Sequence, residues 1–253
     1  YVSDDASGRE LLSAIRGSMA ELAAMDEGHE FGRLETELEG TKAEDWANEW
    51  KKYFHSMEIG ERLLVKPEWE ELEAETDRIV FNVNPGMSFG TGSHETTRLC
   101  LEALEKYVTP GCRMLDLGCG SGILSVVSLL LGAKESVAVD IDPNCIDTAY
   151  ENADMNGVPR DKYHVIAGNV VTDPDVQEYI SKNKYEVVAA NIVADVIIGL
   201  APKAREYMKE GGVFITSGII DGRQEDVKAA LIENGFTIES MSRRKDWWSI
   251  VCR

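Results

Sequence analysis

The sequence predicts an α/β protein built around a doubly wound parallel sheet, with part of a smaller α+β unit before it. From residue 112 onward, short apolar runs alternate with amphipathic segments at intervals that suit parallel β-α-β units. The first of these runs ends in a glycine-rich turn that leads into a helical pattern. The last two runs have no helix between them, which indicates a terminal antiparallel hairpin.

The composition is that of a globular protein with a strong acidic excess. The chain has 253 residues, enough for one large domain and a smaller one. Its 26 basic and 45 acidic residues give a net charge of −19, which argues against a broad nucleic-acid surface and favours a basic partner. The sequence leaves the oligomeric state open.

Cysteine, histidine and apolar patterns exclude several other classes of protein. The five cysteines are scattered, with no C-x-x-C pair, as in a reduced protein with buried thiols. The four histidines lack the spacing of metal ligands, so we expect no metal site. No apolar run approaches the ~18 residues that span a bilayer, and no signal peptide opens the chain. We therefore expect a cytoplasmic protein without a membrane span.

The segment 1–41 predicts part of a small α+β domain. Residues 1–2 read as the end of a strand, 8–25 carry apolar side chains at helical spacing, and 34–38 alternate with period two. This order of strand, helix and strand is about half of a complete α+β unit.

The segment 42–80 predicts a connection between the two domains. Residues 42–54 place Trp46, Trp50, Tyr53 and Phe54 on one helical face, which indicates a packed linker helix. Carboxylates crowd 68–77, so we expect a solvated surface segment there. The large domain then covers 81–253.

The elements of the large domain follow from the spacing of apolar residues. The predicted strands are 112–117, 136–140, 163–167, 185–191 and 212–216, with the hairpin formed by 236–241 and 248–252. The predicted helices are 121–131, 143–155, 174–180, 194–209 and 223–234. A further helix running to Tyr107 is expected before the first strand, capped by Ser93.

The glycine turn at 118–122 is the first candidate binding site. Gly118 and Gly120 allow positive φ and close approach of a ligand to the backbone at the carboxyl end of a strand. Asp140 ends the next strand, 22 positions beyond Gly118, where its carboxylate can accept two hydrogen bonds from a ribose. A nicotinamide cofactor uses the same arrangement. Its G-x-G-x-x-G spacing is not met, because Ile123 stands at the last position, which favours S-adenosylmethionine.

Two further segments carry polar residues at the expected ligand edge. Asn191 ends the fourth strand, where its side-chain oxygen can accept an N–H bond from an amine and orient its lone pair. The alternative is a helix-capping role before residue 194. Glycines at 86, 90 and 92 surround an aromatic residue in a segment that can drape over a cofactor or form a plain surface turn.

Four segments together resemble the bacterial ribosomal protein L11 methyltransferase family, and the resemblance runs from about residue 46 to the end of the chain. They are 85–97 (Pro-Gly-Met-Ser-Phe-Gly-Thr-Gly-Ser-His-Glu-Thr-Thr), 116–124 (Asp-Leu-Gly-Cys-Gly-Ser-Gly-Ile-Leu), 140–143 (Asp-Ile-Asp-Pro) and 190–192 (Ala-Asn-Ile).

The resemblance implies a Rossmann-like, seven-stranded methyltransferase sheet joined to a ferredoxin-like substrate-recognition domain. It implies transfer of methyl groups from S-adenosylmethionine to lysine ε-amines and the N-terminal α-amine of ribosomal protein L11. The cofactor contacts implied by the motifs are Thr97, Gly118, Gly120, Asp140, Asn191 and Phe89. Asn191 is the implied catalytic residue, lying beside the methyl group and the amine. No direct nucleic-acid partner is implied.

The chain departs from the family pattern at two places. Only about half of the first domain precedes Trp46, and Asn169 stands after the third strand, where many methyltransferases have an acidic residue for the adenine amino group. The Asn169 oxygen can still accept that bond. Three alternatives stay open: an N-methyltransferase of another protein or small amine, a nicotinamide oxidoreductase, and a silent ribosome-assembly factor.

Overall fold

The structure of the chain is a computed structural model that describes residues 6–25, 34, 36, 55–72, 74–84 and 94–253. The chain divides into two compact units, Tyr1–Lys52 and Tyr53–Arg253. This division falls inside the segment 42–80 that the sequence assigns to a connection. No helix in the described part of the chain has the length and apolar character needed to cross a membrane.

The described part of the first unit is mainly one helix, α1 (Ala6–Met25), which confirms the helix expected over 8–25. Its apolar side chains Leu11, Ile15, Leu22 and Met25 are exposed. The strand expected at 1–2 and the linker helix expected over 42–54 lie outside the described residues. Of the strand expected over 34–38, only two residues are described, and neither is in a strand.

The second unit begins with a small three-stranded sheet that the sequence reasoning missed. Strands β1 (Met57–Ile59) and β2 (Leu63–Pro67) are antiparallel, and β3 (Ile79–Val83) lies parallel to β2. The acidic segment between β2 and β3 forms their connection and is mostly exposed, as predicted. These strands have only three to five residues, too few to show a clear alternation of apolar and polar side chains.

The large sheet has seven strands in the order β6-β5-β4-β7-β8-β10-β9, which confirms the doubly wound α/β fold. Its strands are β4 (Arg113–Leu117), β5 (Glu135–Asp140), β6 (Tyr163–Ala167), β7 (Tyr185–Asn191), β8 (Met208–Ile220), β9 (Ile238–Arg244) and β10 (Trp247–Cys252). The pairs from β6 to β8 are parallel, whereas β10 is antiparallel to both β8 and β9. The terminal hairpin is therefore confirmed.

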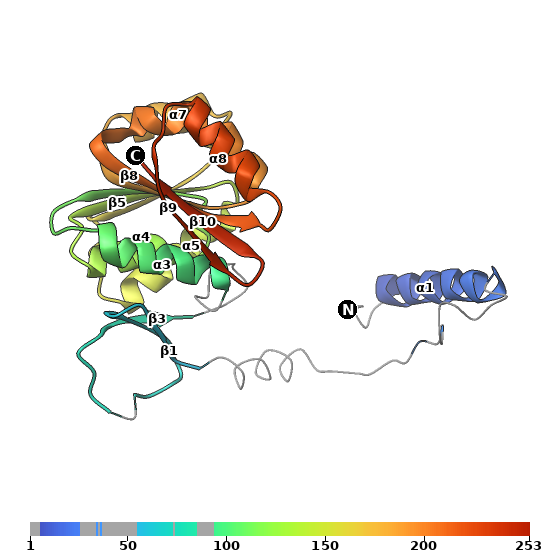
Figure 1. Cartoon of the computed structure of the whole chain (residues 1–253). Coiled ribbons are helices and arrows are strands. Elements are labelled where there is room, and N and C mark those ends of the chain that lie inside the picture. Colours follow the sequence, from blue (N-terminus) through green and yellow to red (C-terminus); the bar gives the residue numbers. More distant parts are fainter. Residues whose placement is uncertain (1–5, 26–33, 35, 37–54, 73, 85–93) are drawn as a thin grey trace. The chain divides into compact units, whose positions relative to one another are not determined.

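Helices cover both faces of this sheet, with α3, α4 and α5 on one face and α7 and α8 on the other (Figure 1). The helices are α3 (Glu95–Tyr107), α4 (Ile123–Leu130), α5 (Asn144–Met155), α6 (Pro174–Ser181), α7 (Ala194–Tyr207) and α8 (Gln224–Glu233). They match the predicted helices to within a few residues. Two details of the prediction are wrong: β8 extends well beyond 212–216, and α3 is capped by His94 rather than by Ser93. β8 is long because it pairs with β7 on one edge and β10 on the other.

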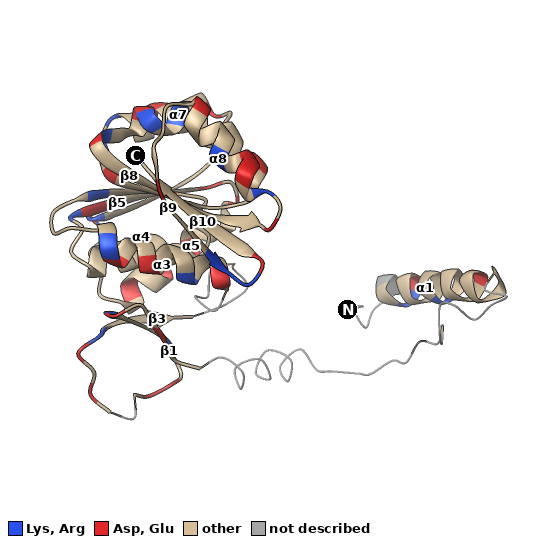
Figure 2. Cartoon of the chain, viewed as in Figure 1, with Lys and Arg blue, Asp and Glu red and all other residues tan. Residues whose placement is uncertain are grey.

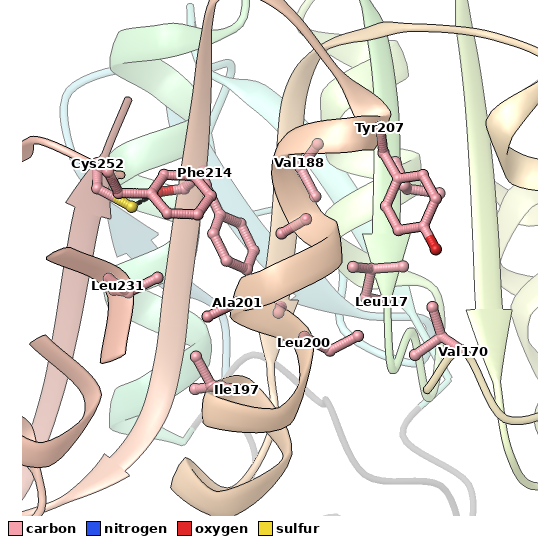
Figure 3. Close-up of a cluster of buried hydrophobic side chains, with 14 of the residues drawn as sticks. Leu117, Val170, Val188, Ile197, Leu200, Ala201, Tyr207, Phe214, Leu231 and Cys252 are labelled. Carbon is pink, nitrogen blue, oxygen red and sulfur yellow. Dashed lines mark hydrogen bonds between the residues drawn. The ribbon is translucent and has the colours of Figure 1, made fainter. Parts of the chain in front are cut away.

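The core between the sheet and α7 fixes the position of the strands (Figure 3). Val188 and Phe214 from the sheet and Ile197 from α7 are completely buried there, and Leu200 is nearly so. Each such side chain contributes about 1.5 to 3 kcal/mol when it leaves water. This packing holds the carboxyl ends of β4, β5 and β7 rigidly next to one another.

Candidate functional site

The glycine turn follows β4, the strand at which the sheet changes direction. The chain runs from β4 outward through β5 to β6 and then returns to β7 on the other side of β4. In such sheets, ligands bind at the carboxyl ends of the strands beside this reversal. Asp140 ends β5 and Asn191 ends β7, so these two predicted residues lie on either side of the turn.

The backbone of the turn requires glycine. Gly118, Gly120 and Gly122 have φ values of 82°, 50° and 78°, in the left-handed region that side chains other than glycine's rarely adopt. A Cβ on Gly118 would lie 2.3 Å from Cγ2 of Ile192, and one on Gly122 would lie 2.4 Å from the Tyr163 hydroxyl. The turn therefore brings bare backbone to the ligand edge of the sheet.

The Asp140 carboxylate lies against this turn. The Gly120 N–H donates to Oδ2 of Asp140 at 2.8 Å, and the Asp142 N–H donates to Oδ1 at 3.0 Å. Asp140 is only partly buried, and each carboxylate oxygen can accept a further hydrogen bond. The side chain is thus fixed by backbone donors while keeping acceptor capacity for two hydroxyl groups.

Asn191 and Thr97 meet although they are far apart in the sequence. The Asn191 Nδ2 donates to Oγ1 of Thr97 at 3.4 Å, and Thr97 is completely buried. Oδ1 of Asn191 is buried and has no hydrogen-bond partner in the described part of the chain. An unpaired buried acceptor costs about 1 to 3 kcal/mol, which makes it a candidate for binding a ligand donor.

The helix-capping alternative for Asn191 is wrong. The cap of α7 is Val193, and no side chain caps that helix end. The Asn191 N–H and C=O groups of the side chain are therefore not spent on the helix.

Asn169 does not offer the free oxygen that the sequence suggested. Its Oδ1 accepts from the backbone N–H groups of Val171 at 2.9 Å and Thr172 at 3.3 Å. These two bonds occupy both lone pairs of the amide oxygen, because the side chain stabilises the turn after β6. Phe89 and the rest of 85–93 lie outside the described residues.

Asp116 is a residue at the site that sequence reasoning did not single out. It is completely buried on β4, and its Oδ2 accepts from the N–H and hydroxyl of Ser125 in α4, at 3.2 and 2.8 Å. Burial raises the pKa of this carboxyl to about 7, against the lowering effect of the bonds from Ser125. An acidic residue within an apolar strand, directly before the glycine turn, was the available signal.

The cysteines near the site are unreactive in character. All five thiols are buried and unpaired, as the sequence predicted. Burial raises the pKa of Cys119, and the Asp116 and Asp140 carboxylates raise it further. A thiol with a raised pKa is a poor nucleophile, so the site lacks a cysteine suited to covalent catalysis among these residues.

A family model described as "Ribosomal protein L11 methyltransferase (PrmA)" matches residues 10–253. A protein of that name from Lachnoclostridium phytofermentans is 41% identical over 260 residues, covering 96% of this chain and 77% of the relative. Another from Agathobacter rectalis is 39% identical over 258 residues, covering 100% of this chain and 79% of the relative.

Solved structures give the same picture of the fold. The crystal structure of a ribosomal protein L11 methylase from Lactobacillus delbrueckii subsp. bulgaricus superposes with a TM-score of 0.71 at 29% identity, over 79% of this chain and 98% of that one. A putative S-adenosylmethionine-dependent methyltransferase from Streptococcus mutans, 13% identical, has a TM-score of 0.54 over 64% of this chain and 49% of that one.

Proposed function

The chain belongs to the ribosomal protein L11 methyltransferase family, and from this premise we propose that it methylates amines of ribosomal protein L11 at the Asn191 site. It is an S-adenosylmethionine-dependent protein methyltransferase. The resemblance found in the sequence motifs is thereby confirmed. The observation that carries the assignment of the site is the buried, unpaired oxygen of Asn191 at the reversal point of the sheet.

The residues of the turn fit a sulfonium nucleoside. Asp140 keeps acceptor capacity for ribose hydroxyls, and the glycines at 118 and 120 let the ligand approach the backbone. When bound, S-adenosylmethionine supplies a methyl group that is already activated by the positive sulfur. The work left to the chain is therefore to bind and orient the two reactants.

Asn191 is suited to orient the incoming amine. Its Oδ1 can accept an N–H bond from a neutral amine, which directs the nitrogen lone pair away from the amide. The bond from Nδ2 to Thr97 fixes which way the amide faces, because Thr97 is held in the buried face of α3. An amide does not titrate at ordinary pH, so Asn191 positions the amine rather than deprotonating it.

The charge of the chain supports a basic protein substrate. The net charge is −19, and acidic side chains are spread over the helices of the second unit rather than confined to one of them (Figure 2). Attraction of this kind raises the rate of encounter with a basic protein. Within L11, we propose lysine ε-amines and the N-terminal α-amine as the methyl acceptors, in accord with the implied chemistry of the family.

An N-methyltransferase of another protein or of a small amine is the second candidate, because the groups around Asn191 recognise an amine without specifying what carries it. The deciding experiment incubates the protein with purified L11 and isotopically labelled S-adenosylmethionine, followed by peptide mass spectrometry. We expect label on L11 amines. Label on other basic proteins but none on L11 would overturn the proposed substrate, and no transfer to any acceptor would support a silent assembly factor.

A further inference from the structure

Two asparagines on one face of α5 connect this helix to β3 and its end. Asn152 and Asn156 stand one helical turn apart, so their side chains project from the same side of α5. Asn156 pairs with Asn82 of β3: its Oδ1 accepts from the backbone N–H and its Nδ2 donates to the backbone C=O, both at 2.7 Å. Asn152 makes a different connection.

Asn152 bridges two segments that are not otherwise neighbours in the chain. Its Nδ2 donates to the carbonyl oxygen of Ser121, inside the glycine turn, at 2.9 Å. Its Oδ1 accepts from the backbone N–H of Asn84, just beyond β3, at 3.2 Å. The partners fix the orientation of the amide, since a backbone N–H can only donate and a C=O can only accept.

The bridge is buried and rigid. Asn152 has no exposed surface, so water cannot replace either bond at low cost. The two bonds come from one planar amide, and a movement of the Ser121 carbonyl therefore acts on the N–H of Asn84 through a single stiff group. The opposite side of the turn is held by Asp140, through the N–H of Gly120.

Asn84 is the point at which the segment 85–93 leaves the small sheet. On the other side of this segment, His94 caps α3 and stacks edge-on against Trp247, with ring centroids 4.9 Å apart. Thr97, the partner of Asn191, follows within the first turn of α3. The chain from Asn84 to Thr97 thus starts at the Asn152 bridge and ends beside the amine-orienting residue.

We propose that Asn152 is a positioning residue, which couples the cofactor-binding turn at Ser121 to the root of the 85–93 segment at Asn84. This inference rests on the proposed function, because it takes the turn to be the cofactor site. Occupation of the turn favours one position of Asn84, and the reverse also holds, since coupling between two sites is reciprocal. The substrate is then received by a segment whose root is set by the bound cofactor.

Asn156 provides a matched control for Asn152. It lies on the same helix and makes the same kind of amide contacts to backbone near β3, but its bonds go to Asn82 and to the Asn152 backbone, not to the glycine turn. Asn156→Ala removes a link between α5 and β3 while leaving the turn untouched. A merely structural contribution of these asparagines would therefore appear in both variants.

The test measures S-adenosylhomocysteine binding by calorimetry and, on the same samples, amide hydrogen exchange of 85–93 with and without saturating S-adenosylhomocysteine. For Asn152→Ala we expect about a tenfold rise in Kd, or about 1.4 kcal/mol, and loss of most of the ligand-induced protection of 85–93. For Asn156→Ala we expect a Kd within about twofold of the wild type and full protection.

Asn152→Asp separates the two halves of the bridge and also serves if the alanine variant does not fold. It keeps an acceptor for the Asn84 N–H but turns an oxygen toward the Ser121 carbonyl, so only the link to the turn is lost. We expect it to behave as Asn152→Ala does. Equal Kd values and equal protection in the Asn152 and Asn156 variants would overturn the coupling. A wild-type protein that binds no S-adenosylhomocysteine would instead overturn the proposed function.

Discussion

The Asp140 carboxylate accepts a hydrogen bond from the backbone N–H of Gly120 at 2.8 Å, although the two residues belong to different strand-to-helix connections. Gly120 lies beyond the end of β4 and Asp140 ends β5, its parallel neighbour. A single carboxylate can thus order the turn and bind hydroxyl groups of a ligand. This dual role gives the first prediction.

Replacement of Asp140 by alanine should weaken S-adenosylhomocysteine binding by about 1 to 3 kcal/mol, because the ribose hydroxyls and the Gly120 N–H both lose an acceptor. Calorimetric titration measures the effect. Asp154→Ala is the control, since Asp154 is exposed on α5 and pairs only with Arg160 among its ion-pair partners in the described chain. A Kd for Asp140→Ala that matches this control would remove Asp140 from the cofactor site.

Replacement of Asn191 by alanine should reduce kcat much more than it weakens cofactor binding, because the amide oxygen is proposed to orient the amine. Thr97→Val removes the partner of Nδ2 while keeping the volume, and we expect a smaller loss of kcat in the same direction. Steady-state methyl transfer combined with S-adenosylhomocysteine titration separates the two quantities. Equal losses of turnover and cofactor affinity in Asn191→Ala would contradict an orienting role.

Replacement of Gly118 by alanine should destabilise the fold by more than backbone conformation alone explains. The new Cβ meets Cγ2 of Ile192 at 2.3 Å, in addition to the strain at a φ of 82°. Gly111→Ala is the control: its φ is 83°, but nothing lies within 4 Å of the added Cβ. We expect a loss of about 1 to 2 kcal/mol for Gly111→Ala in urea unfolding and a larger loss for Gly118→Ala. Equal losses would show that Ile192 moves aside freely.

The buried carboxyl of Asp116 should make stability depend on pH. Burial raises its pKa from 3.8 to about 7, so the folded protein keeps a proton that the unfolded chain releases. The contribution to stability is full below pH 3.8, declines as the pH rises toward 7, and is level above that. Asp116→Asn, which keeps an acceptor for Ser125, removes this titration.

The measurement for Asp116 is the difference in free energy of unfolding between wild type and Asp116→Asn from pH 4 to pH 8. We expect the variant to gain stability relative to the wild type as the pH rises, because it never carries the buried charge. A difference that stays constant across this range would mean that Asp116 has an ordinary pKa in the folded protein.

Amino-acid sequence alone was sufficient for the order of elements in the large domain and for the main ligand turn. Strands β6 and β7 begin and end where the apolar runs predicted, because a run of buried residues reports its own strand. The turn after β4 and the carboxylate after β5 were likewise found from local spacing. Backbone conformation at glycine and the alternation of strands and helices are local properties, so a single sequence can reveal them.

The tertiary structure decided which polar groups meet. Thr97 and Asn191 are 94 positions apart, and Asn84 and Asn152 are 68 apart, so no local spacing relates either pair. Asn169 turned inward to its own backbone, and the short strands of the small sheet exist only through pairing with one another. The physical reason is that the partner of a hydrogen-bonding side chain is set by how separate elements pack, and packing is a property of the whole domain.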